Sequence, residues 1–145
     1  MRKPTDESEL DNLNKLINAH PLGAFLAACT YLEKIINDFA ENVGLDKELR
    51  RRPYWMLISH RLLERYGIEL PEDIRKEMDE IRRLRNTVSH GQKDPTKSEV
   101  KEAIKVIERI KTYFGSLNYD EVRQTVNKAI SENQKEAGET SYNSE

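Results

Sequence analysis

The residues best suited to chemistry lie close together in the segment from Ile81 to Pro95, IRRLRNTVSHGQKDP. The guanidinium of Arg85 is planar and can bind a phosphodiester through two parallel hydrogen bonds. Asn86 adds an uncharged donor and acceptor, and a histidine such as His90 can take up and release a proton near neutral pH. Together these side chains favour chemistry on a phosphate ester.

The same segment has the period of a helix, which indicates where each of its arginines points. Arg85 lies on the apolar side of this predicted helix, whereas Arg82 and Arg83 lie off it and are expected to be solvated. Burial of an arginine is costly unless its charge is paired or opens onto a cleft. We therefore expect Arg85 to be paired or to face a cleft or a partner. The apolar side consists of Ile74, Met78, Ile81, Leu84 and Val88.

Helix geometry also constrains how Arg85 and His90 can act together. Residues five positions apart leave an ideal helix about 140° apart, so the two side chains of one continuous helix point in different directions. They can converge within one chain only if the helix unwinds near Ser89, and Gly91 supplies backbone freedom for that.

The rest of the chain shows the helical period as well, and no segment alternates long enough to predict a strand. Thr96 and Glu99 have the spacing of a capping box. The sequence therefore predicts an all-α protein, an antiparallel helical bundle with a four-helix core plus short flanking helices. Helix starts are predicted at Asp6, Pro21, Pro53, Pro71, Thr96 and Asn118, and helix ends at Gly44, Gly67 and Gly91.

The predicted core depends mainly on the helix that begins at Pro21. Its apolar stripe includes Cys29, an expected inert packing residue, and Leu26 widens that stripe. Leu16 of the first predicted helix is expected on a core-facing side. Residues 1–130 are expected to form a single domain, and residues 131–145, SENQKEAGETSYNSE, a disordered tail because they are almost free of apolar side chains.

Composition limits the classes of function. The net charge is −2, so any contact with RNA must rest on a local basic patch. A single cysteine excludes an intrachain disulfide and fits a reducing cytoplasm, and no apolar run is long enough to span a membrane. The histidines and carboxylates have no spacing that suggests a metal site, and no cofactor motif is present. A helix-turn-helix with an exposed basic recognition helix is not found either.

The stretch LRNTVSHG resembles the signature of the HEPN superfamily, in which an arginine, a polar residue, a few further residues and a histidine follow one another. Arg85, Asn86 and His90 match it, with four residues between the arginine and the histidine. The likeness covers roughly Leu22 to Phe114, and the motif ends the penultimate core helix as it does in that family. In one group of toxins a tyrosine follows the histidine two residues later, whereas this chain has Gln92.

The resemblance implies a specific activity. Many HEPN proteins are metal-independent endoribonucleases of toxin, defence or RNA-processing type, and they dimerise so that two Arg/His motifs form one composite site. By that likeness Arg85, Asn86 and His90 are the catalytic candidates, and RNA, a second copy and a cognate antitoxin or partner protein are the expected partners. Other HEPN proteins are non-catalytic interaction or RNA-binding modules that regulate a partner, which is the alternative prediction.

Simpler interpretations remain open for each candidate residue. Arg85 can pair with an acid of a neighbouring helix while His90 caps the helix end, and Asn86 can bind backbone locally. Glu33 can orient Arg85, although a solvated position is the favoured interpretation. Arg51, Arg52 and Lys93 are candidate RNA-contacting residues, and the alternative for the two arginines is a solvated loop ahead of a helix.

Overall fold

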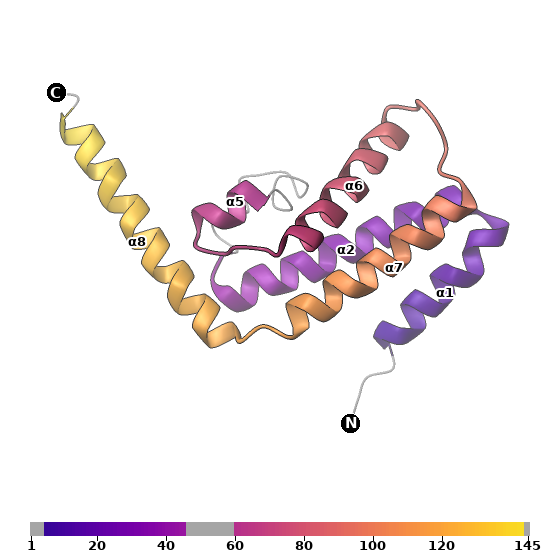
Figure 1. Ribbon diagram of the computed structural model, residues 1–145, viewed down its shortest axis with the longest axis horizontal. Coiled ribbons are helices and arrows are strands. Elements are labelled where there is room, and N and C mark those ends of the chain that lie inside the picture. The colour runs from indigo at the N-terminus through magenta and orange to yellow at the C-terminus, as the bar shows by residue number, and fades with distance from the viewer. Residues whose placement is uncertain (1–4, 46–59, 144–145) are drawn as a thin grey trace. The chain divides into compact units, whose positions relative to one another are not determined.

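The computed structural model describes residues 5–45 and 60–143, and it places the side chains of residues 11–45 and 63–136. The described residues form six α-helices and no strand, which confirms the all-α prediction (Figure 1). The predicted helix start at Pro53 lies outside these residues. The helices are α1 (Thr5–Ala19), α2 (Pro21–Val43), α5 (His60–Arg65), α6 (Glu72–Ser89), α7 (Lys97–Gly115) and α8 (Tyr119–Asn143).

Local signals account for several helix ends. Pro21 is the first residue of α2, and the side-chain Nδ1 of His20 accepts a hydrogen bond from the backbone N–H of Gly23 at 2.9 Å. This is an N-cap contact, since it satisfies one of the free N–H groups of the first turn. The helices α2 and α6 end where glycines with positive φ follow them, Gly44 at 82° and Gly91 at 66°. The predicted ends at these glycines are therefore confirmed.

The described chain forms two compact units. The first contains α1, α2 up to Ile35, α6 from Lys76 and all of α7. Within this unit α1 packs against α7 (Figure 1). The buried residues of α7 recur with the period of a helix and lie on one face, together with buried side chains of the other helices. The core of this unit includes Ile17, Phe25, Cys29, Leu32, Met78, Ile81, Val100, Ile104, Ile107, Ile110 and Phe114.

Two leucines expected on core-facing sides are instead exposed. Leu16 of α1 has 39% of its surface accessible and Leu26 of α2 has 44%, so the prediction of a core position is wrong for both. Their helices bury neighbouring residues, Ile17 on α1 and Phe25 on α2. The core-facing side of a helix covers only about 100° of its circumference, so apolar residues at the edge of that side are left facing solvent.

The second unit contains the end of α2, helix α5, the start of α6 and α8. Arg123 of α8 donates from Nε and Nη2 to the backbone oxygen of Asn42, at 3.0 and 2.7 Å. A cation at the carboxyl end of a helix is stabilising because the last carbonyls there lack partners. Phe39 and Tyr119 add an edge-to-face ring contact, with centroids 5.9 Å apart.

Helix α8 is longer than the sequence predicted. A short helix was expected after Asn118, whose Oδ1 accepts from the backbone N–H groups of Asp120 and Glu121 at 3.1 and 3.2 Å. The helix continues to Asn143, so its backbone is helical through most of the segment expected to be disordered. Low apolar content limits burial but not helix formation, and Glu, Gln, Lys and Ala are good helix formers.

Candidate functional site

The end of α6 carries the predicted motif and remains regularly wound. The N–H of His90 donates to the oxygen of Asn86 at 3.0 Å, so helical bonding reaches the histidine. The N–H of Gly91 then bonds to Val88 at 3.0 Å and that of Gln92 to Thr87 at 3.1 Å. With the positive φ of Gly91, these two bonds are a Schellman C-cap, in which a helix ends without unwinding first.

This C-cap decides the relation between the two charged motif residues. The unwinding near Ser89 that would let Arg85 and His90 of one chain converge does not occur, since α6 includes Ser89 and its bonding continues to His90. The two side chains therefore leave the helix about 140° apart. Gly91 acts after the histidine, as a helix terminator.

Arg85 points towards the neighbouring helix, as its place on the apolar side predicted. Its side chain is 32% exposed, and its Nη2 lies 3.7 Å from Oε1 of Glu33 on α2, whose side chain is only 21% exposed. The solvated position that we favoured for Glu33 is therefore wrong. The sequence offered this pair only as the less favoured alternative, because it depends on how two helices pack. A 3.7 Å separation is an ion pair but too long for a strong hydrogen bond.

Cys29 lies beside this ion pair and is buried. Burial raises the pKa of the Cys29 thiol to about 12, against a lowering by Arg85 and a further raising by Glu33. The thiolate is the reactive form of cysteine, so this residue stays protonated and unreactive near neutral pH. The prediction of an inert packing residue is confirmed.

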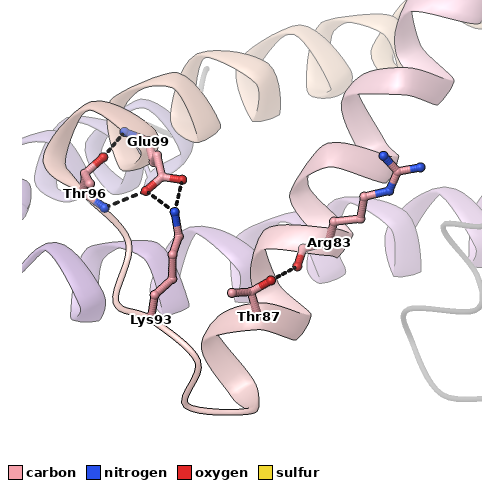
Figure 2. A network of polar contacts seen from close by, with 5 residues as sticks. All are labelled: Arg83, Thr87, Lys93, Thr96 and Glu99. Atoms are coloured by element: carbon pink, nitrogen blue, oxygen red, sulfur yellow. Dashed lines mark hydrogen bonds and ion pairs between the residues drawn. The ribbon is translucent and has the colours of Figure 1, made fainter.

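Asn86 and His90, the other two catalytic candidates, are exposed on the surface of α6. Arg83 is exposed as well, and its backbone oxygen accepts a hydrogen bond from the hydroxyl of Thr87 at 3.0 Å (Figure 2). The side chain of Arg82 is 38% exposed and pairs with Asp79 at 3.3 Å, so it is partly solvated.

The connection between α6 and α7 is held by a polar network around Glu99 (Figure 2). Thr96 and Glu99 form the predicted capping box, with reciprocal bonds of 3.0 and 3.1 Å. The backbone N–H of Thr96, and then the ammonium of Lys93, hold the pKa of Glu99 below its usual value. Lys93 contacts both carboxylate oxygens, at 3.2 and 3.0 Å. Its charge is therefore compensated, which lowers its value as an RNA contact.

A groove between α6 and α7 lies close to this network. It has a volume of about 230 Å³ and an apolar lining that includes Ile81 and Leu84. Its polar lining consists of the three carboxylate side chains of Glu80, Glu99 and Glu102. Like charges repel, so this groove disfavours a phosphate group.

The structure bears on only some of the remaining predictions, which concern two arginines, metal sites and membrane spans. Arg51 and Arg52 lie outside the described residues. Within residues 11–45 and 63–136 no group of three or more His, Cys, Asp or Glu side chains is placed to hold a metal ion. No helix in the described part of the chain has the length and apolar character to cross a membrane. No family model, curated protein or solved structure matches this chain.

Proposed function

We propose that this protein is a HEPN-like endoribonuclease that works as a homodimer and needs no metal ion. Its fold would be the antiparallel four-helix-cored bundle of that superfamily, and it would act in the cytoplasm. The supporting observation is the presentation of the motif. His90 is exposed at the C-cap of α6, and Arg85, directed elsewhere by the winding of the helix, contacts Glu33. One chain thus offers an incomplete site that a second chain completes.

The proposed chemistry uses the ribose 2′-hydroxyl as the nucleophile. His90 of one protomer takes its proton, the 2′-oxygen forms a bond to phosphorus and the bond from phosphorus to the 5′-oxygen breaks. His90 of the partner subunit protonates that leaving oxygen, which gives a 2′,3′-cyclic phosphate and a 5′-hydroxyl. Arg85, oriented by Glu33, stabilises the charge that develops on the phosphate oxygens, and Asn86 donates a hydrogen bond.

The first test measures cleavage of a labelled single-stranded RNA in the presence of a chelator. We expect the wild-type protein to produce 2′,3′-cyclic phosphate ends, and His90→Ala and Arg85→Ala to lower kcat by about 100-fold or more. Controls are His20→Asn, which keeps a capping side chain at the start of α2, and Arg82→Ala. Equal activity of all five proteins would disprove the proposal.

The second test asks whether two histidines act together. Wild-type and His90→Ala chains are co-expressed in different ratios, so that dimers form at random. If each reaction needs His90 from both protomers, activity falls with the square of the wild-type fraction. A linear fall would show that each chain has its own site, and a monomeric protein in sedimentation would exclude the composite site altogether.

The second candidate function is a non-catalytic HEPN-like module that binds RNA or regulates a partner protein such as a cognate antitoxin. The pairing of Arg85 with Glu33 and of Lys93 with Glu99 favours it, because these two cations already have acidic partners. Its signature is wild-type protein that binds RNA or a partner without cleaving RNA.

A further inference from the structure

The three clustered arginines of α6 differ in what their charges contact. Arg82 pairs with Asp79 at 3.3 Å and Arg85 with Glu33 at 3.7 Å. The guanidinium of Arg83 makes no hydrogen bond or ion pair with any residue whose side chain the structure describes, and it is exposed. An exposed arginine without an acidic partner keeps its full charge and its planar set of donors for a ligand.

The winding of α6 places this arginine on the same face as the histidine. Arg83 and His90 are seven residues apart, which on a helix is about 20° short of two full turns. Asn86 lies between them, about 60° from Arg83 and 40° from His90. Because helical bonding continues to His90, this spacing holds over the whole interval. The three side chains therefore form an exposed strip on one side of the helix.

The strip is separate from the acidic groove. Figure 2 shows the Arg83 side chain directed away from the connection that carries Lys93, Thr96 and Glu99. The acids one turn before Arg83 are Asp79, which pairs with Arg82, and Glu80, which lines the groove. Towards His90 the neighbours are Asn86 and Thr87, which carry no charge. Among the described residues of α6, a phosphate backbone that follows the strip from Arg83 to His90 therefore meets no acid.

From these observations we propose that Arg83, with Asn86, binds the phosphate backbone of a single-stranded RNA next to the scissile phosphate at which His90 acts. The inference rests on the proposed function and deepens it by naming a substrate contact. Arg83 and His90 are about 10 Å apart along the helix axis, which is more than one phosphate group spans. Arg83 thus contacts a phosphate other than the scissile one, and the substrate must extend beyond the cleaved linkage.

Binding is measured apart from cleavage, in protein that carries His90→Ala. The probe is a fluorescent single-stranded RNA oligonucleotide, titrated at several salt concentrations. We expect the added change Arg83→Ala to weaken binding about tenfold, since a charge-assisted contact to phosphate is lost. The slope of log K against log salt should fall by about 0.7, the value for one phosphate contact on a single strand.

Arg82→Ala is the matched control, because it removes the adjacent arginine from the same turn but one whose charge is paired. Arg83→Lys keeps the charge and should keep the salt slope while losing part of the affinity. Circular dichroism checks that each variant is folded. If Arg83→Ala and Arg82→Ala change affinity and salt slope equally, or if the protein binds no RNA, the inference is wrong.

The dependence of binding affinity on RNA length is a second measurement, and a purely structural role of Arg83 would leave it unchanged. The His90→Ala protein should bind the oligonucleotide more tightly than a dinucleoside monophosphate, which has a single phosphate. Arg83→Ala should remove most of that difference, and an unchanged difference would contradict the inference. RNA that binds through Arg83 but is never cut by the wild-type protein would instead disprove the proposed ribonuclease and leave this contact standing.

Discussion

The two faces of α6 carry the same residue type in different circumstances. On the inner face, Arg85 lies among apolar neighbours and contacts Glu33. On the outer face, Arg83 and His90 are exposed on a helix that remains wound to its last turn. A charge near a core must be paired and is thereby held in place, whereas a charge on the surface keeps its freedom for a ligand. One helix thus supplies both an oriented cation and an available one.

The first prediction separates the two faces by stability and has the largest expected effect. Met78 on the inner face is 1% exposed, so Met78→Ala removes buried apolar surface and leaves a cavity. We expect a loss of about 3 kcal/mol in the free energy of unfolding, measured by urea denaturation. Arg83→Ala, on the outer face, should change it by less than about 0.5 kcal/mol.

Met78→Leu is the control for the inner face, because it conserves volume and should cost less than about 1.5 kcal/mol. Similar losses for Met78→Ala and Arg83→Ala would mean that the two faces do not differ in this way.

The second prediction concerns the helix end that keeps His90 on the outer face. Gly91 has a φ of +66° and Gly115, at the end of α7, has no positive φ, although neither has an atom within 4 Å of an added Cβ. Substitution by alanine therefore tests backbone conformation alone. Gly91→Ala should destabilise by about 1 kcal/mol, whereas Gly115→Ala should be neutral or slightly stabilising. Thermal unfolding of both variants measures this, and equal effects would contradict the C-cap.

The features that sequence predicted correctly are local. Thr96 and Glu99 interact three positions apart, Gly44 and Gly91 end helices through their own backbone, and the buried residues of α7 follow from helical period. The inward direction of Arg85 follows from the same period. Each of these depends on a short stretch of chain, so its physical cause can be read from neighbouring residues.

What the sequence did not predict depends on packing between distant segments. The contact of Glu33 with Arg85 was named but not favoured, because it requires α2 and α6 to be neighbours and no residue pattern within either helix indicates this. Leu26 is exposed because other residues of α2 fill the interface. The position of Arg83 is an exception, because its seven-residue spacing from His90 was visible in the sequence. Arg83 was set aside because it lies off the apolar side of the helix, where a solvated arginine is expected.

The last prediction has the smallest expected effect and tests how firmly the inner face holds Arg85. In a double-mutant cycle of Glu33→Gln and Arg85→Gln, the coupling free energy should be below about 1 kcal/mol, because the 3.7 Å pair is partly solvated. Raising the salt concentration should reduce it further. For a buried structural pair, removing one partner alone would instead lower the free energy of unfolding by about 3–5 kcal/mol. A loss of that size for either single variant would mean that Arg85 cannot readily exchange its carboxylate partner for a phosphate. It would then favour the non-catalytic module over the ribonuclease, whereas weak coupling keeps Arg85 available to an RNA substrate.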